Sequence, residues 1–340
     1  MKISNKAAMV LGGISIVSSS LVYSADPKVS FYGLIDVYSA AVKTENNGSN
    51  KSNYVVNSSG FTTSFIGAKT KIPLSGNLTG VAVVESFLRP DVGKLGRFDA
   101  DNLFTRNAFI GLNGNFGSIS MGRITTLYFI STIITNPFGG SFGFGPSIKN
   151  SFLGGLQGDS GWNNAVKYST PSMGGVKASV LYSAGEVASE AGVNKMNANI
   201  VYGKGKFKGT ASIQKLDAQA DDPTAAKDDN QLAAMAGASY NLGVATISGQ
   251  FFMMKTETAG VDTDHKTAQI GAAIPVGKAK VLASVAHTKM DAVTDTDRTT
   301  AALSYDYFIS KKVDVYTVLY MDDADSSKNY TAGVGGRVRF

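Results

Sequence analysis

Apolar and polar residues alternate in segments of about ten residues along much of the chain, most regularly from Lys195 to Phe340. Successive side chains of a β-strand point to opposite sides of the sheet, so this alternation predicts strands with one apolar face. Three such predicted faces are Met196, Ala198, Ile200 and Tyr202; Phe207, Gly209, Ala211 and Ile213; and Leu303, Tyr305, Tyr307 and Ile309. The residues between them are mostly polar, so the second half of the chain is predicted to consist of strands and their connections.

The same pattern, read along the whole chain, predicts about sixteen strands. They lie at residues 29–41, 58–71, 76–89, 101–115, 117–124, 163–171, 174–184, 195–203, 206–215, 231–241, 244–255, 266–276, 278–289, 298–309, 312–323 and 328–340. Every second connection is a tight turn, as at 75–77, 114–115, 203–205, 241–243 and 310–311, and the connections between these are long and polar. A barrel inserted from one side of a bilayer shows this asymmetry, which a soluble sandwich does not need. The sequence therefore predicts an all-β, antiparallel transmembrane β-barrel with its apolar face outward.

Composition agrees with a barrel that encloses water. The chain has 340 residues, no Cys and 38 Gly, and its mean hydropathy is +0.01 because a wet lumen needs polar residues inside as well as in the loops. Residues 1–25 begin with Lys2 and Lys6, continue through a mostly apolar stretch and end in small residues. This pattern predicts a signal peptide, cleaved after Ser24 or Ala25, and leaves residues 26–340 as the barrel domain.

The last predicted strand ends in an aromatic residue. Its apolar face would hold Tyr330, Ala332, Val334, Gly336, Val338 and Phe340, whereas Arg337 and Arg339 would lie on the other face. A terminal Phe340 on an amphipathic strand is the pattern by which outer-membrane barrels are recognised for assembly. We therefore predict that Phe340 is the signal read by the barrel-assembly machinery.

Several segments carry a family resemblance. They are VSFYGLIDV at 29–37, LFTRNAFIGL at 103–112, FGSISMGRI at 116–124, WNNAVKYSTPSMGGVKASVLYS at 162–183, LSYDYFISKKVDVYTVLY at 303–320 and GVGGRVRF at 333–340. The chain resembles the general trimeric porins of Gram-negative outer membranes, in particular the neisserial and burkholderial branch, from about residue 29 to its end. It departs from them at Val338, where His is common, at Trp162, where a basic residue is common, and at Lys312, where Arg is usual.

The resemblance implies a sixteen-stranded barrel that forms a homotrimer and narrows its channel with an inward-folded third loop. Residues between Arg123 and Asn163 show no clear strand and are long enough to be that loop. Within them, Asn136, Pro137, Phe138, Gly139, Gly140 and Ser141 resemble the family's ProGluPheGlyGlyAsp stretch at the constriction. The two acids of that stretch are matched here by Pro137 and Ser141, and no Asp or Glu occurs between Asp101 and Asp159.

The resemblance also implies a basic wall opposite the constriction loop. Lys69, Arg106 and Arg123 match its positions, and Phe65 stands where a further Arg is expected. Charge of one sign in a narrow aqueous neck selects ions of the opposite sign. The hypothesis is therefore a channel for passive diffusion of small hydrophilic solutes and ions that prefers anions. The alternative for Arg106 and Arg123 is that they cap the barrel rim or bind lipid headgroups.

The sequence gives weaker support for three other functions. A substrate-specific channel for a sugar or an organic anion would use the loop aromatics, which are Tyr128, Phe129, Phe138, Phe142 and Phe144. A surface adhesin would need longer loops or an added domain. An outer-membrane hydrolase would need a Ser/His pair, and nothing ties His265 or His287 to a particular Ser. We expect no enzyme activity, no cofactor and no nucleic-acid partner.

Three further groups of residues bear on partners. Asp217, Asp221, Asp222, Asp228 and Asp229 could hold a divalent cation that bridges lipopolysaccharide, or form a solvated surface. Asp262, Asp264 and His265 are spaced like metal ligands but are predicted to lie in a loop, and no metal site is expected there. Ser118, Ser120 and Gly122 are predicted to face outward, where small residues would let protomers approach closely in the trimer. Contact with outer-membrane lipid and lipopolysaccharide is expected elsewhere on the outer face.

Overall fold

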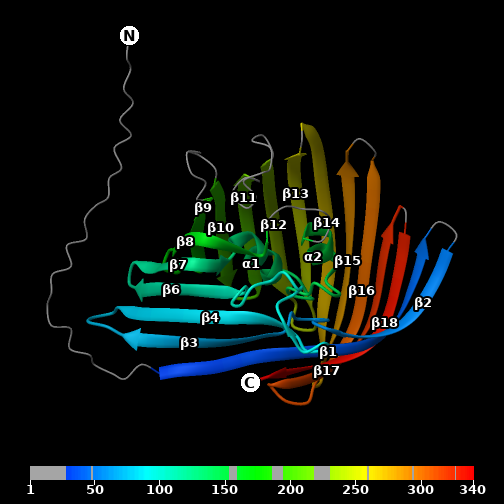
Figure 1. Cartoon of the computed structure of the whole chain (residues 1–340), viewed down its shortest axis with the longest axis horizontal. Coiled ribbons are helices and arrows are strands. Elements are labelled where there is room, and N and C mark those ends of the chain that lie inside the picture. The colour runs from blue at the N-terminus through cyan, green and yellow to red at the C-terminus, as the bar shows by residue number, and fades with distance from the viewer. Residues whose placement is uncertain are drawn as a thin grey trace, which may run out of the picture.

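The protein is a single antiparallel sheet that curves round and closes on itself, because its first strand pairs with its last (Figure 1). This computed structural model describes residues 28–46, 49–152, 159–185, 194–217, 230–258, 260–292, 295–325 and 327–340. The predicted signal peptide at 1–25 and four of the acids in the predicted cation cluster, Asp221, Asp222, Asp228 and Asp229, lie outside these residues.

The first half of the chain forms the less regular part of the wall. Its strands are β1 (Lys28–Asn46), β2 (Ser49–Ser58), β3 (Phe65–Pro73), β4 (Thr79–Arg89), β5 (Lys94–Leu95), β6 (Asn107–Gly114), β7 (Gly117–Thr125), β8 (Gly161–Ser169) and β9 (Val176–Ala184). Two helices, α1 (Leu127–Ile134) and α2 (Pro146–Phe152), lie between β7 and β8.

The second half is an uninterrupted series of hairpins. Its strands are β10 (Asn194–Lys204), β11 (Phe207–Asp217), β12 (Asn230–Asn241), β13 (Thr246–Thr258), β14 (Val261–Val276), β15 (Ala279–Asp291), β16 (Thr296–Phe308), β17 (Val313–Ala324) and β18 (Ser327–Arg339). Each strand pairs with its neighbours in sequence, as a meander of antiparallel strands does.

Two details make this set of strands a closed sixteen-stranded barrel, as predicted. The two-residue β5 only forms a short hairpin on the end of β4. β2 and β3 share one place in the wall, because β2 pairs with residues 37–46 of β1 and β3 pairs with residues 28–34. Residues 59–64, which connect β2 to β3, leave the wall; we call them the inner segment. Sequence reasoning treated this interrupted strand as one strand at 58–71.

The predicted alternation of apolar and polar faces is confirmed in the second half. Along β11, Ala211 and Ile213 are exposed on the outer face while Ser212 and Gln214 are buried on the inner face. The same holds for the closing strand, where Val334 and Val338 face out and Arg337 faces in. A belt of apolar side chains therefore surrounds a polar interior, which suits a wall between lipid and water.

The prediction that Ser118, Ser120 and Gly122 face outward was wrong. Ile119 and Met121 are the exposed residues of β7, at 40% and 54%, and Ser120 is buried inside. The ladder between β7 and β8 shifts between Gly122 and Ile124, where Gly122 adopts a φ of +133°. This bulge breaks the alternation of faces along β7. If Arg123 is taken to face the lumen and the residues before it are assigned by strict alternation, Ser118, Ser120 and Gly122 are placed on the wrong face.

The predicted long loops are shorter than expected, because the strands continue through them. Only a few residues separate β13 from β14, β15 from β16, and β1 from β2. The predicted loops at 42–57 and 256–265 are therefore mostly strand, and strand residues make up half of the one at 290–297. Asp262, Asp264 and His265 lie on β14. Polar side chains do not stop strand pairing once both faces of a hairpin meet water, so polarity alone overestimated loop length.

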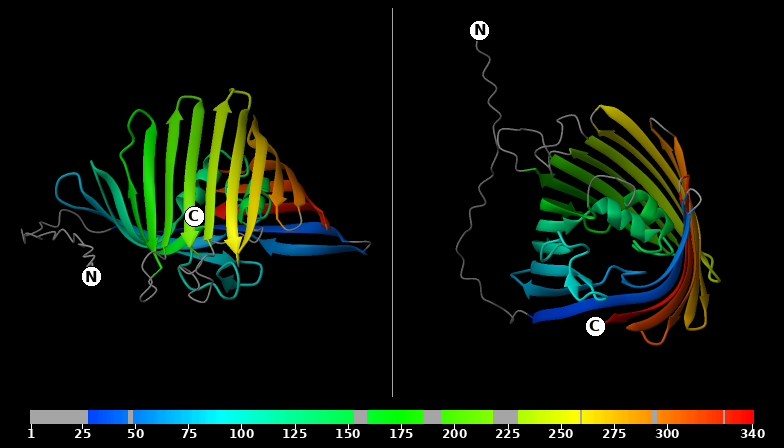
Figure 2. Two further views of the ribbon diagram at one scale, coloured as in Figure 1. Left: turned by 90° about the horizontal axis from the view of Figure 1, so that it is seen from above. Right: turned by 45° about the vertical axis from the view of Figure 1, so that its right-hand side comes forward.

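The segment between β7 and β8 folds into the barrel, as predicted. Figure 2 shows its helices, in green, enclosed by the ring of strands. α1 packs against β9 to β12, and α2 packs against β14 to β16. Among the described residues, no helix has the length and apolar character needed to cross a membrane.

Candidate functional site

The base of the inward loop is fixed to the wall where it leaves β7 and returns to β8. The backbone N–H of Thr126 donates to the carbonyl of Ser160 at 2.9 Å. The side chain of Thr126 also caps α1, since its hydroxyl accepts from the backbone N–H of Phe129 at 3.2 Å. The two ends of the loop are therefore held side by side before the chain crosses the lumen.

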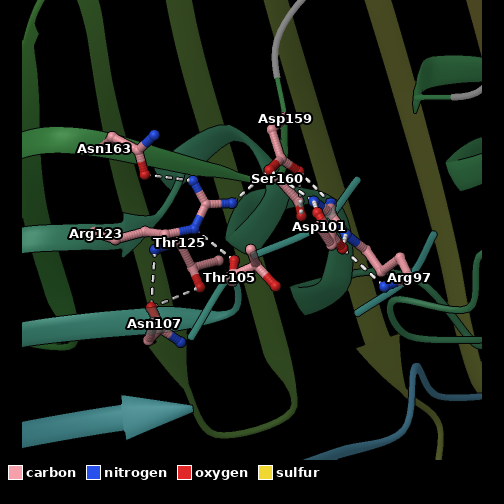
Figure 3. Close-up of polar contacts among 9 residues, drawn as sticks. All are labelled: Arg97, Asp101, Thr105, Asn107, Arg123, Thr125, Asp159, Ser160 and Asn163. Carbon is pink, nitrogen blue, oxygen red and sulfur yellow. Dashed lines mark hydrogen bonds and ion pairs between the residues drawn. The ribbon is translucent and has the colours of Figure 1, made fainter. Parts of the chain in front are cut away.

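Arg123 is the centre of this base (Figure 3). Its Nε donates to the carbonyl of Thr105 at 2.5 Å, its Nη1 to Asn163 Oδ1 at 2.8 Å, and its Nη2 to Asp159 Oδ2 at 2.5 Å. All three nitrogens of the guanidinium are thus committed to the wall and to the returning end of the loop. In this arrangement Arg123 secures the loop and is not a free cation of the channel.

A second arginine shares the same carboxylate. Arg97 donates to Asp159 Oδ2 from Nη2 at 3.0 Å and to Asp101 Oδ2 from Nε at 2.8 Å. Burial alone would raise the pKa of Asp159, but hydrogen bonds and charge from Arg97, joined by Arg123, outweigh it and lower that pKa. These two arginines and two carboxylates form a neutral cluster that ties the loop base to residues 90–106.

Arg106 is also paired. Its guanidinium forms an ion pair with the buried carboxylate of Glu85 and lies 3.9 Å from the ring centroid of Phe65. Tyr32 and Asn107 donate to the same carboxylate at 2.5 Å each. Glu85 stands opposite Asn107 in the ladder between β4 and β6, which is how an acid distant in sequence reaches Arg106.

The basic wall was expected to face no carboxylates. This expectation is wrong for Arg106 and Arg123, two of its three residues. The acid-free window in the sequence is real, but Glu85 and Asp159 lie just outside it, and the fold brings each one to an arginine. Lys69 is the exception. It lies on the inner face of β3, 4.7 Å from the ring centroid of Tyr32, and forms no ion pair with any described residue.

Three more lysines resemble Lys69, although none of them was assigned to the channel wall from the sequence. Each of them lies on the inner face of its strand, two residues from a buried Ser or Thr on the same face. They are Lys167 on β8, Lys177 on β9 and Lys208 on β11. None of them forms an ion pair with another residue in the part of the chain that the structure describes. We call Lys69, Lys167, Lys177 and Lys208 the lysine wall. Their strand parity could have revealed them, because each is two residues from a lumen-facing polar residue.

The predicted tip of the constriction loop crosses to the opposite wall. Pro137 lies against β14, where a Cβ added to Gly271 would come within 2.6 Å of its Cγ. Asn136 donates to Ser147 Oγ at 3.0 Å, and Ser141 donates to the carbonyl of Gly60 at 2.7 Å. Gly139 makes the turn with a φ of +57°, which favours glycine, and Gly140 packs against Phe129 and Ile133 of α1.

The tip meets the inner segment, so the constriction has two inward parts. Phe61 of the inner segment lies edge-on to Phe138 of the loop tip, with ring centroids 5.7 Å apart. Phe61 also stacks on Tyr316 of β17, with centroids 4.1 Å apart and rings nearly parallel. Phe138 and Phe144 are both buried in this aromatic cluster. This contact closes the lumen on the side of β17.

A buried polar group holds the inner segment. The carboxylate of Asp36 accepts from the backbone N–H groups of Phe61 and Thr62, at 2.8 and 2.7 Å, and from the Tyr316 hydroxyl at 2.7 Å. Arg337 lies over the Phe61 ring at 4.9 Å and donates to Asp306 and Asp314 at 2.7 and 2.6 Å. We call Asp36, Asp306, Asp314, Tyr316 and Arg337 the clamp cluster.

The loop also borders a cavity. A cavity of about 520 Å³ separates Phe142 and Phe152 of the loop from Arg89 and Tyr38 of the wall. Of the loop aromatics considered for a sugar or organic-anion path, Tyr128, Phe138 and Phe144 are buried in packing. Phe129 and Phe142 stack on each other, with ring centroids 5.4 Å apart. The aromatics therefore pack the loop and do not form a continuous line along the lumen.

Phe340 closes the barrel seam. Its backbone exchanges two hydrogen bonds of 3.2 Å with Gly33 on β1, and its ring covers Gly33, where a Cβ would come within 2.7 Å of Cζ. The ring remains 52% exposed on the outer surface. Its role in recognition by the assembly machinery stays a prediction.

The histidines and acids considered for other chemistry do not converge. His265 faces inward beside Met290 Sδ, whereas Asp262 and Asp264 occupy the opposite face of β14. His287 Nδ1 lies 3.0 Å from Thr299 Oγ1, on the outer side of the wall. Among the described residues, no group of three His, Cys, Asp or Glu side chains is arranged to hold a metal ion.

Comparison with known proteins places the chain in a family. The model of the Gram-negative porin family matches residues 7–327. Outer membrane porin protein 32 of Delftia acidovorans is 25% identical over 327 residues, which cover 92% of this chain and 89% of that protein. The solved structure of an anion-selective porin from Comamonas acidovorans has a TM-score of 0.80 at 22% identity, over 93% of this chain and 100% of that one.

The trimer form of OmpT from Vibrio cholerae has a TM-score of 0.69 at 17% identity, over 93% of this chain and 100% of that one. At these identities the two solved structures establish a shared barrel fold, while the family match spans most of the sequence. The resemblance drawn from the sequence is confirmed. The chain belongs to the Gram-negative porin family and forms a channel across the outer membrane of a Gram-negative bacterium.

Proposed function

We propose that this porin is a passive diffusion channel for small hydrophilic solutes and ions, and that it prefers anions. The observation that carries this proposal is the difference in pairing between the lysines and the arginines of the lumen. Arg106 and Arg123 each have a carboxylate partner, whereas Lys69, Lys167, Lys177 and Lys208 have none among the described residues.

An ion pair has little net field a few ångströms away, but an unpaired ammonium keeps its field. Between low-dielectric walls that field is weakly screened and raises the local concentration of anions. The lysine wall therefore supplies the preference that the sequence analysis attributed to Lys69, Arg106 and Arg123, and Lys69 is the one of these three residues that it retains. The relative from Comamonas acidovorans, described as anion-selective, supports the same assignment.

The test is the reversal potential of the purified protein in a planar bilayer under a KCl gradient. We expect a potential of the sign that chloride permeation produces. A potential of the opposite sign would overturn the preference for anions, although the channel itself would still stand.

We infer that the functional unit is a homotrimer. The outer face of the N-terminal strands exposes Phe31 at 82% and Tyr54 at 90%, and apolar residues of the loop at 90–106, such as Leu103, are exposed as well. Apolar groups of this size on either side of the inner segment suit contact with another protomer, and OmpT of Vibrio cholerae has a trimer form. Mass measurement in detergent should give three chains for the wild type and fewer for Tyr54→Lys; a monomeric wild type would contradict the inference.

The predicted signal peptide at 1–25, the assembly signal at Phe340 and the lipid contacts belong to the same proposal. Outward-facing charges lie above the apolar belt, as in the pairs Lys255 with Asp262 and Lys328 with Asp323. Charges at that height suit the headgroups of outer-membrane lipid and lipopolysaccharide. N-terminal sequencing of the mature protein would locate the cleavage site.

A further inference from the structure

The inner wall below the constriction carries a group of hydroxyl and ammonium side chains that the loop does not cover with acids. Lys167 stands opposite Ser120 in the ladder between β7 and β8, and Ser169 stands opposite Ser179 in the ladder between β8 and β9. Lys177 is two residues from Ser179 on the same face of β9. We call Ser120, Lys167, Ser169, Lys177 and Ser179 the lysine–serine patch.

The geometry places the two lysines on either side of the serines. Residues two apart on a strand are separated by about 7 Å, and neighbouring strands by about 4.8 Å. Lys167 is two residues from Ser169 in one direction, and Lys177 is two residues from Ser179 in the other. Both long side chains can therefore reach the level of the serine pair from opposite ends of the patch.

The serine hydroxyls of the patch keep donor capacity that the wall does not use. Ser179 Oγ donates to Ser169 Oγ at 2.8 Å, which leaves the hydrogen of Ser169 free for another acceptor. Both serines are nearly buried, so the wall restricts their rotation. Ser120 hydrogen bonds to no other described residue through its side chain and lies directly beside Lys167.

The charge around the patch is positive without compensation. The strands β6, β7, β8, β9 and β10 contain no Asp or Glu at all. Lys167 is partly buried, with its ammonium 5.9 Å from the ring centroid of Phe109, and has no ion-pair partner in the described part of the chain. A partly buried charge without a partner is costly, and a mobile anion from the channel would offset that cost.

We propose that the lysine–serine patch binds a tetrahedral oxyanion of the phosphate type on its way through the channel. The ammonium groups of Lys167 and Lys177 supply the charge, and the hydroxyls of Ser120 and Ser169 donate to its oxygens. Chloride is stabilised there by the ammonium charges but has no tetrahedral set of oxygens to accept from the serines. The patch therefore distinguishes a phosphate from a simple halide. This inference rests on the proposed preference for anions and adds a binding site to it.

The experiment is a titration of the chloride current through single channels with inorganic phosphate at constant ionic strength. The wild type should show saturable inhibition, because bound phosphate occupies the passage. Lys167→Gln and Ser169→Ala should each raise the phosphate concentration for half inhibition by roughly tenfold, the loss of one charge-assisted hydrogen bond. Both variants should keep the folded band on unboiled gels.

Lys208→Gln is the matched control, because it removes the same charge from the lumen two strands away from the patch. Its half-inhibition concentration should stay within about twofold of the wild type. If the half-inhibition concentration rises equally in Lys208→Gln and Lys167→Gln, the effect comes from the overall charge of the lumen. That result would contradict a specific site at the lysine–serine patch. Absence of saturable inhibition in the wild type would overturn it too.

The reversal potential separates this inference from the proposed function. Anion preference in KCl with no saturation by phosphate would leave the diffusion channel standing and remove the binding site. Saturation by phosphate that depends on Lys167, in a channel without anion preference, would keep the site and contradict the preference.

Discussion

The two sides of the lumen differ in how their charges are partnered. On the side of β16 to β18, the clamp cluster pairs Arg337 with Asp306 and Asp314 and surrounds Asp36 with donors. On the side of β3 to β11, Arg106 and Arg123 are paired as well, but the ammonium groups of the lysine wall have no carboxylate partner among the described residues. The difference separates charges that hold the constriction in place from charges that act on solutes.

The largest effect should come from removing a paired charge of the clamp cluster. Arg337→Met leaves Asp306 buried without its cation, and breaking a buried pair in this way costs about 3–5 kcal/mol. Urea unfolding of the barrel in detergent should show this loss of stability. Lys208→Gln, which removes an exposed and unpaired charge, should change stability by less than about 0.5 kcal/mol. Equal stability of the two variants would mean that ion pairing does not give the clamp cluster a structural role that the lysine wall lacks.

A smaller effect is expected from crowding the loop tip. Gly271→Ala places a Cβ within 2.6 Å of Pro137 Cγ and 2.9 Å of the Ala283 carbonyl, so the loop must shift or the barrel must lose about 1–3 kcal/mol. We expect lower single-channel conductance as the tip moves into the passage, with partial recovery in Gly271→Ala/Pro137→Ala.

Gly249→Ala is the matched control for this prediction. The neighbourhood of Gly249 is open, with the nearest atom 3.7 Å from the added Cβ. Its conductance should equal that of the wild type. A Gly271→Ala channel with unchanged conductance and unchanged stability would show that the tip does not rest on β14.

The smallest effect should come from acid pH on the loop base. The pKa of Asp159 is held below its ordinary value, since hydrogen bonds from Arg97 and Arg123 outweigh the rise caused by burial. A depressed pKa in the folded protein gives stability that is present above the unfolded value, near 3.9, and is lost only as pH falls through the folded value. Single-channel conductance should therefore be constant from pH 7 to about pH 5; a transition inside that window would contradict the ionised cluster.

The regular half of the fold could be predicted from the sequence because one rule governs it. From β10 to β18 each strand has lipid on one side and the lumen on the other, so side-chain polarity directly indicates the face. The number of strands, the tight turns and the outward position of Phe340 follow from that rule. Loop lengths were overestimated, because polar strands that extend beyond the membrane obey no such alternation.

The constriction could be predicted only in part. The length of the segment after Arg123 and the stretch from Asn136 to Ser141 located the inward loop. The pairing of Arg106 with Glu85 and of Arg123 with Asp159 could not be read from the sequence, since both pairs form across strands or between a strand and a loop. The bulge at Gly122 and the inner segment also break the local rule. Irregular backbone is thus concentrated where the channel narrows.

The assignment of selectivity to unpaired charges can be tested by comparing two variants in one assay. Lys69→Gln/Lys177→Gln removes two positive charges that have no partner. Glu85→Gln/Arg106→Gln removes one charge of each sign from a single pair and leaves the net charge unchanged. Under a KCl gradient, the reversal potential of the first variant should move clearly toward that of potassium, and that of the second should match the wild type. An unchanged potential in the lysine variant, or an equal shift in the pair variant, would contradict the assignment.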